Sequence, residues 1–108
     1  MHAFDVLGDP VRRRILELLR EGEHASGTVT QIIREEFAIS QPAVSQHLKI
    51  LREHGFATVR SEGTRRFYTV DVTPMREANA WLETFRQFWE PKLDALAEEI
   101  ARGKNQEM

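Results

Sequence analysis

The sequence contains no cysteine, which excludes disulfide bonds, thiolate metal ligands and thiol redox switches together. It also lacks any apolar run close to the roughly 18 residues that a membrane-spanning helix requires, so no membrane partner is expected. The opening residues, MHAFDVLGD, carry acidic side chains and no basic segment, unlike a secretory signal. These absences favour a cytoplasmic protein with an ordinary apolar core.

The net charge of −2 hides an uneven distribution of charge along the 108 residues. Residues 1–40 carry five basic and seven acidic side chains, and residues 67–108 carry five and eight. Residues 41–66, between them, carry five basic side chains and only two acidic ones, an excess of three positive charges. A basic segment of this kind is typical of a surface that binds nucleic acid, although an ordinary solvated surface gives the same pattern.

Capping residues and helical spacing predict three short helices in the first part of the chain. Residues 2–7 form the first, and a second starts at Asp9 and Pro10, since aspartate is a favoured N-cap and proline a favoured first residue. After a turn, Thr28 and Gln31 match a capping box at the start of the third. Apolar residues at helical spacing then mark the buried side of each.

A fourth helix and a β hairpin follow. Ser40 is an N-cap and Gly55 a C-cap for the helix. Residues 56–60 and 65–70 are rich in β-branched and aromatic side chains and predict two strands, joined by a turn of two or more residues. Helices joined by a tight turn and followed by a β ribbon describe a winged helix-turn-helix, mainly α with a small β hairpin, in the order α-α-α-α-β-β-α. A single domain over 1–108 is expected.

The fourth helix, within SQPAVSQHLKILREHG at residues 40–55, has an unusual exposed face. Val44, Leu48 and Leu51 point inward on a helical wheel, while serine, glutamine and basic side chains point outward. Such side chains pair with base edges, and free N–H groups at the helix start suit a phosphate. His47 lies near the inward side, so it is either a hydrogen-bonded core histidine or a DNA contact from the flank.

The tip of the hairpin is rich in arginine. Arg60, Arg65 and Arg66 lie near the turn at Gly63 and suit a minor groove or flanking phosphates, with Arg60 the weakest of the three candidates. A charged edge strand that resists aggregation is the alternative. The predicted DNA-binding residues are Ser40, Gln41, Ser45, Gln46, His47, Lys49, Arg52, Arg60, Thr64, Arg65 and Arg66.

A last helix is predicted from Thr73-Pro74 to about residue 102, with Pro91 expected to kink or break it near residues 87–91. Its aromatic side chains exceed what a thin monomer core absorbs, and an exposed patch of that size marks an interface. Residues 73–102 are therefore expected to form a dimerisation helix, although a hydrophobic effector pocket between the two tryptophans is an alternative. The predicted dimer residues are Phe4, Leu7, Trp81, Leu82, Phe85, Phe88, Trp89, Leu93 and Leu96.

Three segments resemble the ArsR-type winged-helix repressors of bacteria: LGDPVRRRILELL at residues 7–19, SQPAVSQHLKILREHG at 40–55 and SEGTRRFYTV at 61–70. The resemblance covers residues 3 to about 71. It implies a homodimer that binds a palindromic operator on double-stranded DNA and usually represses its own operon. The stretch from Glu23 to Ser40 is a few residues longer than the compact family pattern, which implies an extended third helix or loop.

Many members of that family sense metals through cysteines or through Asp/His sets on the terminal helices. This chain has no cysteine and no histidine in its last helix, so no metal site is expected and any effector, a small molecule or a protein, stays unidentified. No nucleophile–base pair or glycine-rich phosphate loop is present, so neither an enzyme nor a cofactor is expected. The alternative is a winged-helix protein-interaction module that has lost DNA binding.

Overall fold

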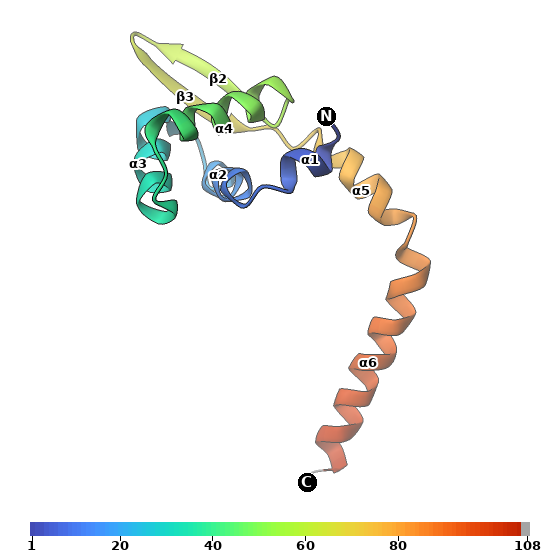
Figure 1. Cartoon of the computed structure of the whole chain (residues 1–108). Coiled ribbons are helices and arrows are strands. Elements are labelled where there is room, and N and C mark those ends of the chain that lie inside the picture. Colours follow the sequence, from blue (N-terminus) through green and yellow to red (C-terminus); the bar gives the residue numbers. More distant parts are fainter. Residues whose placement is uncertain (107–108) are drawn as a thin grey trace. The chain divides into compact units, whose positions relative to one another are not determined.

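The computed structural model describes residues 1–106, with side chains described as far as residue 103. Figure 1 shows helices together with a small sheet, which confirms the predicted fold class. The elements are α1 (Ala3–Leu7), α2 (Pro10–Arg20), β1 (His24–Ala25), α3 (Ser26–Phe37), α4 (Gln41–Glu53), β2 (Ala57–Glu62), β3 (Arg65–Val70), α5 (Met75–Glu83) and α6 (Arg86–Gln106). They form two compact units, Met1–Ala78 and a second that begins at Asn79.

The core of the first unit lies between its helices and one face of the sheet. Helix α2 contacts α3, α4 and β3, so it is the element around which the others pack. The three predicted inward residues of α4, Val44, Leu48 and Leu51, are all buried there. Because burial of apolar surface is the main stabilising contribution to folding, this core fixes the orientation of α4.

Side chains cap α2 and α4 as the sequence predicts. The Asp9 carboxylate accepts hydrogen bonds from the backbone N–H groups of Val11 (2.8 Å) and Arg12 (3.2 Å). The Ser40 hydroxyl oxygen accepts one from the N–H of Ala43 at 3.3 Å. These bonds satisfy donors that the first turn of a helix leaves without a partner.

The predicted start of α3 is wrong. The helix begins at Ser26, and its N-cap residue, Ala25, makes no side-chain capping bond, so Thr28 and Gln31 do not form a capping box. The reason is non-local: His24 and Ala25 form strand β1, which pairs with β3. That pairing holds the chain extended as far as Ala25, and the helix starts directly after it.

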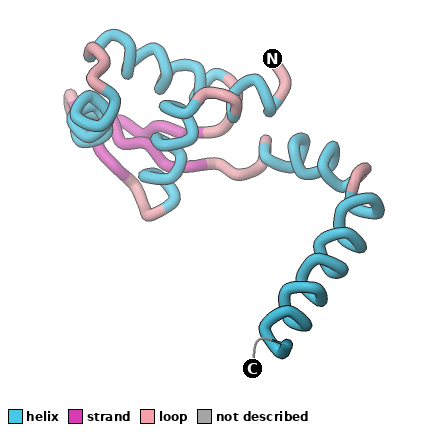
Figure 2. Tube along the Cα trace, turned by 60° about the horizontal axis from the view of Figure 1, so that its bottom comes forward, coloured by secondary structure: helices cyan, strands magenta, loops and turns pink. Residues whose placement is uncertain are grey.

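The sheet is antiparallel, with strand order β1-β3-β2. Figure 2 draws its strands in magenta. Glu62 pairs with Arg65, which leaves a two-residue turn at Gly63 and Thr64 and settles the hairpin register that the sequence left open. Gly63 has a φ of 62°, a conformation that glycine adopts at little cost. We call this β2–β3 hairpin the wing.

The last predicted helix is interrupted, but not near residues 87–91 as the sequence predicts: α5 and α6 are separated at Thr84 and Phe85. The Thr84 hydroxyl donates to the carbonyl of Trp81 at 2.6 Å, and the N–H of Phe85 donates to the carbonyl of Leu82 at 3.0 Å. These i to i−3 bonds compete with the helical pattern and end α5. Pro91, the expected site of the break, lies inside α6, and α6 extends beyond residue 102.

Candidate nucleic-acid interface

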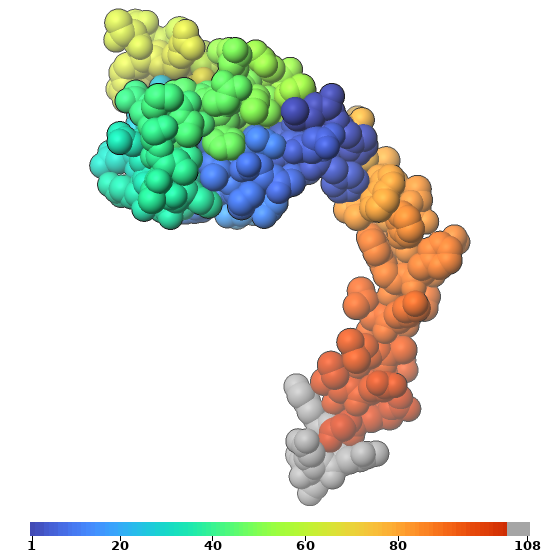
Figure 3. All heavy atoms as spheres, viewed as in Figure 1, coloured from blue at the N-terminus to red at the C-terminus, as the bar shows by residue number. Residues whose placement is uncertain are grey.

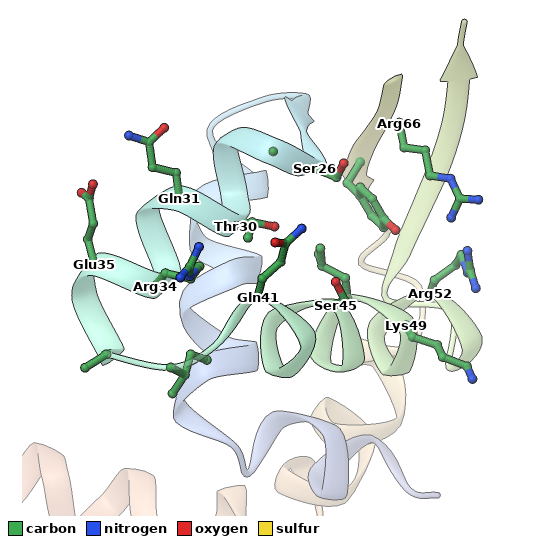
Figure 4. Close-up of a pocket in the computed structure, with 15 residues that line it drawn as sticks. Ser26, Thr30, Gln31, Arg34, Glu35, Gln41, Ser45, Lys49, Arg52 and Arg66 are labelled. Atoms are coloured by element: carbon green, nitrogen blue, oxygen red, sulfur yellow. The ribbon is translucent and has the colours of Figure 1, made fainter. Parts of the chain in front are cut away.

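Helices α3 and α4 and strand β3 surround a groove of about 950 Å³ on the first unit, which we call the α3–α4 groove (Figure 4). Figure 3 shows α3, α4 and the wing next to one another on one face of that unit. The polar side chains lining the groove are Ser26, Thr30, Gln31, Arg34 and Glu35 from α3, Gln41, Ser45, Lys49 and Arg52 from α4, and Arg66 and Tyr68 from β3.

Four of the predicted DNA-binding residues on α4 line this groove: Gln41, Ser45, Lys49 and Arg52. Their spacing of four, four and three residues keeps them on one side of the helix, next to the buried apolar stripe. In Figure 4 they follow one another along α4. Helical periodicity together with the packed core therefore aligns a row of hydrogen-bonding and basic side chains on the exposed side.

Two other predicted residues of α4 lie outside the groove. Gln46 is exposed next to Ser45 but is not among the residues lining the groove. His47 is half-buried on the flank of the helix, where its Nδ1 atom lies 3.4 Å from Nη1 of Arg12. The structure therefore places His47 on the flank of α4, in contact with α2 rather than in the core, and a role for it in DNA binding stays a prediction.

Positive charge in the groove is largely uncompensated. Among the described residues, Arg34, Arg52 and Arg66 have no carboxylate oxygen within 4.0 Å. Lys49 lies 3.9 Å from Glu53, but both side chains are about half exposed, and such exposed pairs contribute little. Cations gathered without counter-charges produce a positive potential that favours an anionic partner.

The wing separates its arginines into two groups. The Arg60 guanidinium makes two bonds to the Glu23 carboxylate, at 2.7 and 2.8 Å, and one to Glu62 at 3.0 Å. These bonds hold the pKa of Glu23 below its usual value, because the hydrogen bonds from Arg60 favour the ionised carboxylate. Arg60 is thus already bound within the protein.

Arg65 and Arg66, in contrast, are exposed and have no carboxylate partner within 4.0 Å among residues 1–106. The Arg65 guanidinium lies 5.0 Å from the centre of the Phe67 ring. Together with Thr64, both arginines also line a smaller hollow of about 350 Å³ beside the start of α3. The wing therefore presents free positive charge near its tip, as expected for Arg65 and Arg66.

Sequence reasoning missed the contribution of α3 and of Tyr68. Thr30, Gln31 and Arg34 line the groove from α3, and a helical wheel of that segment would have shown its polar side. Tyr68 lines the groove although the residue is only 4% exposed. An aromatic residue within a strand has the sequence pattern of a core residue. The sequence therefore carries no signal that distinguishes a tyrosine lining the groove from one packed wholly in the core.

The predicted dimer residues differ in their surroundings. Leu7 is half-buried and packs against the core of the first unit, while Phe4 is 37% exposed. From Trp81 to Ile100 the large apolar side chains are between 36% and 60% exposed. These exposed residues are Trp81, Leu82, Phe85, Phe88, Trp89, Leu93, Leu96 and Ile100.

Known proteins are similar to this chain over most of its length. The model of the ArsR family of bacterial regulatory proteins matches residues 9–59. The HTH-type transcriptional regulator Rv2034 of Mycobacterium tuberculosis is 36% identical over 98 residues, which cover 91% of this chain and 85% of that protein. The transcriptional repressor SdpR of Bacillus subtilis is 31% identical over 84 residues, covering 78% and 89%.

Solved structures agree. The crystal structure of a possible transcriptional regulator for arsenical resistance aligns with a TM-score of 0.68 and 31% identity, covering 92% of this chain and 96% of the other. Its fold and the sequence relatives confirm the predicted winged helix-turn-helix, and because the family and these relatives are transcriptional regulators, they also confirm that the protein is not an enzyme. The chain belongs to the ArsR family of bacterial regulatory proteins.

Proposed function

We propose that the protein is a transcriptional repressor that binds a specific double-stranded DNA operator with α4 in the major groove. The observation that carries this proposal is the α4 side of the α3–α4 groove, where Gln41, Ser45, Lys49 and Arg52 form one row with Gln46 beside it. Glutamine pairs with adenine, lysine and arginine pair with guanine or phosphate, and serine donates or accepts. The related SdpR is itself named a repressor.

Contacts to the DNA backbone would come from two places, the wing and the start of α4. The exposed Arg65 and Arg66 of the wing suit phosphates or a narrow minor groove. At the other end, Ser40 and Gln41 lie at the start of α4, where the helix dipole favours a phosphate. Thr64 at the wing turn is exposed and adds a hydroxyl. The backbone contacts would hold α4 in register while its side chains distinguish bases.

The active form is proposed to be a homodimer on an inverted repeat. The support is the row of exposed apolar residues on α5 and α6, an apolar surface that favours association. A two-fold dimer would present two copies of α4 about one DNA turn apart, roughly 34 Å. Autoregulation through the promoter of its own gene is part of the same proposal, and so is a cytoplasmic location, because the proposed partner is DNA.

Regulation by metal is not part of the proposal. The sequence contains no cysteine, and within residues 1–106 no group of three His, Cys, Asp or Glu side chains is arranged to hold a metal ion. An effector, if the protein has one, would be a small organic molecule or a protein.

The test is the salt dependence of binding to a labelled duplex taken from the DNA upstream of the gene, followed by fluorescence anisotropy. Counterion release predicts that log K falls linearly with log salt, by about 0.9 for each phosphate contacted. A scrambled duplex of the same composition serves as the control and should bind more weakly. Absence of binding to either duplex at low salt would contradict the proposal and favour a protein-interaction module.

A further inference from the structure

Tyr68 has a polar group that the protein itself does not use. The residue is 4% exposed, and its backbone pairs with Val59 of β2 and His24 of β1, so its position is fixed from both sides. Among the described residues its hydroxyl has no hydrogen-bond partner, yet no fully buried side-chain oxygen is left without one. The hydroxyl must therefore reach the α3–α4 groove, which Tyr68 lines, and be satisfied from there.

Two cations lie at the same end of the groove as the wing. Arg52 from α4 and Arg66 from β3 line it together with Tyr68 (Figure 4). Neither guanidinium has a carboxylate within 4.0 Å among residues 1–106. Placing like charges on one groove without a counter-charge costs free energy, which an anion bound between them would offset.

The chemistry of this end of the groove matches an oxyanion more closely than the edge of a base. Guanidinium groups are donors only, and a tyrosine hydroxyl donates readily to a charged oxygen. The carboxylate lining the groove, that of Glu35, lies at the opposite end in Figure 4, away from Arg52 and Arg66. Base edges in the major groove offer donors as well as acceptors, whereas a phosphate offers acceptors only.

We propose that the Tyr68 hydroxyl, together with Arg52 and Arg66, binds one phosphate group between α4 and the wing. The proposal rests on the DNA-binding function above for its source, since the phosphate would then belong to the DNA backbone. Because Tyr68 is held by two neighbouring strands, it would fix that phosphate at a set position. Tyr68 is thereby a positioning contact for α4, and the same oxyanion chemistry would also accept free phosphate.

The first experiment compares Tyr68→Phe with the wild type on the duplex described above. The substitution keeps the ring and removes only the hydroxyl, so the thermal unfolding midpoint should stay close to that of the wild type. Affinity should fall about tenfold, as expected for the loss of one hydrogen bond to a charged group. Thr69→Val is the matched control, because it removes an exposed hydroxyl from the opposite face of the same strand. Its affinity should not change.

Replacing single phosphates with neutral methylphosphonate identifies the contact itself. When the methylphosphonate replaces the phosphate that Tyr68 contacts, one position in each half-site, the wild type should lose affinity. Tyr68→Phe should lose little more at that position, because the variant already lacks the hydroxyl that makes the contact. Identical methylphosphonate profiles for the two proteins would overturn the assignment to DNA.

A second arm separates this proposal from the DNA-binding function. Inorganic phosphate is titrated into the DNA-free protein, and amide NMR shifts are followed at residues 52, 66 and 68, with Arg66→Gln as the comparison. Saturable shifts that Arg66→Gln abolishes support the site even if no duplex binds, in which case only the proposed function fails. DNA binding that is insensitive to Tyr68→Phe, together with no phosphate-dependent shift, rejects the site while leaving the function standing.

Discussion

Arg12 and Arg13 supply helix α1 with hydrogen bonds that its own five residues cannot provide. Arg12 donates from Nη2 to the carbonyl of Asp5 (2.8 Å) and from Nε to that of Val6 (2.9 Å), and Arg13 donates to that of Leu7 (2.7 Å). The last carbonyls of a helix have no partner within the helix. Arg12 and Arg13 are therefore used to attach α1 to α2, whereas Arg14 bonds to Glu36 of α3.

Asp9 should make stability depend on acid pH. Burial raises its pKa, but hydrogen bonds from the N–H groups of Arg12 and Val11 and the nearby charges of His47 and Arg12 outweigh burial, so the pKa lies below its usual value. A carboxyl group with a lowered folded-state pKa stabilises the fold above its unfolded pKa, and this contribution is lost as pH falls through the folded value.

Asp9→Ala should therefore lower the free energy of unfolding by about 1 kcal/mol at neutral pH, the usual cost of removing an N-cap. The difference from the wild type should shrink as the pH falls below about 4, the ordinary pKa of an aspartic acid in the unfolded chain, and on through the lower pKa of Asp9 in the folded protein. Asp9→Asn keeps an acceptor oxygen and should cost less. Urea unfolding followed by circular dichroism at pH 7 and pH 3 measures this, and a difference that grows in acid would refute the pKa argument.

Gln46 should contribute to sequence preference. It is exposed on α4 beside Ser45, where a side-chain amide can form two hydrogen bonds to an adenine. Gln46→Ala should weaken binding to the operator by about 1–3 kcal/mol and binding to scrambled DNA very little. Gln31→Ala, the same change on α3, should affect both duplexes equally. Anisotropy titrations of the two duplexes measure these affinities. If Gln46→Ala weakened binding to both duplexes equally, Gln46 would have no role in base recognition.

At the level of elements, the wing combines a fixed base with a free tip. The bonds of Arg60 connect β2 to Glu23 just before β1, and its guanidinium also lies 4.5 Å from the centre of the Phe67 ring. Exposed ion pairs of this kind contribute little to stability, but they orient the strands. Arg65 and Arg66 lie nearer the turn than Arg60 does, so their charges remain available to a partner.

This division predicts different salt effects for the three arginines. Arg65→Gln or Arg66→Gln should weaken binding to all sequences alike and reduce the log–log salt slope by about one each, because each removes a phosphate contact. Arg60→Gln is the matched control and should leave the slope unchanged, since its charge is already neutralised by Glu23 and Glu62. Affinities measured between about 50 and 200 mM salt test this. A slope that changes only for Arg60→Gln would reverse the assignment.

Elements whose signals are local could be predicted from the sequence. The Asp9 and Ser40 caps define the starts of α2 and α4, and Gly55, with a φ of 78°, follows the end of α4 as expected. Strand β1 could not be predicted, because two residues carry no period and exist as a strand only through pairing with β3. The break at Thr84 and Phe85 was missed because it depends on bonds from these two residues to carbonyls three residues earlier, for which the sequence carries no periodic signal.

The candidate site divides in the same way. The row on α4 was predictable, because one helical wheel contains both the buried and the exposed side. The groove itself was not, because it needs residues from α3 and β3 that lie far from α4 in sequence. Arg60 shows the converse, since its type and position suggested a DNA contact, whereas a carboxylate 37 residues away binds it.

For the whole molecule, the exposed apolar residues from Trp81 to Ile100 are the main feature left unexplained by the fold of a single chain. Phe85 is 41% exposed, and its ring centre lies 4.7 Å from that of Trp81 and 6.5 Å from that of Phe88. Burying such aromatic side chains in an association would release much apolar surface from water. The second unit is therefore where a change should affect the number of subunits.

Phe85→Asp should convert a dimer into a monomer of 12.5 kDa and weaken operator binding at the same time, because two linked half-site contacts bind far more tightly than one. Gln87→Asp adds the same charge at an exposed polar position of α6 and should leave the dimer intact. Sedimentation equilibrium at micromolar concentration gives the mass. A wild-type chain that sediments as a monomer would reject the homodimer.

Metal ions should leave DNA binding unchanged, and the positions of the histidines give the reason. Zinc and soft metals require several thiolate, imidazole or carboxylate ligands in a defined geometry. His47 and His54 are separated by seven residues, about two helical turns, which is too far for their rings to share an ion. His24 has its Nδ1 atom 2.8 Å from the carbonyl oxygen of Gly22, in a hydrogen bond within the backbone turn.

The strongest remaining pair is His2 with Glu77, whose Nε2 and Oε1 atoms lie 3.6 Å apart. Glu77 Oε1 already accepts from the N–H of Ala3 at 2.6 Å, and Nδ1 of His2 accepts from that of Phe4 at 3.1 Å, so this pair offers at most two side-chain ligands. Operator affinity should therefore stay within a factor of ten, about 1.4 kcal/mol of coupling, with chelator or with stoichiometric Zn²⁺, Ni²⁺ or Cd²⁺. Any smaller effect should disappear in His2→Asn. A larger change that persists in that variant would require ligands from two subunits and would overturn the metal-independent proposal.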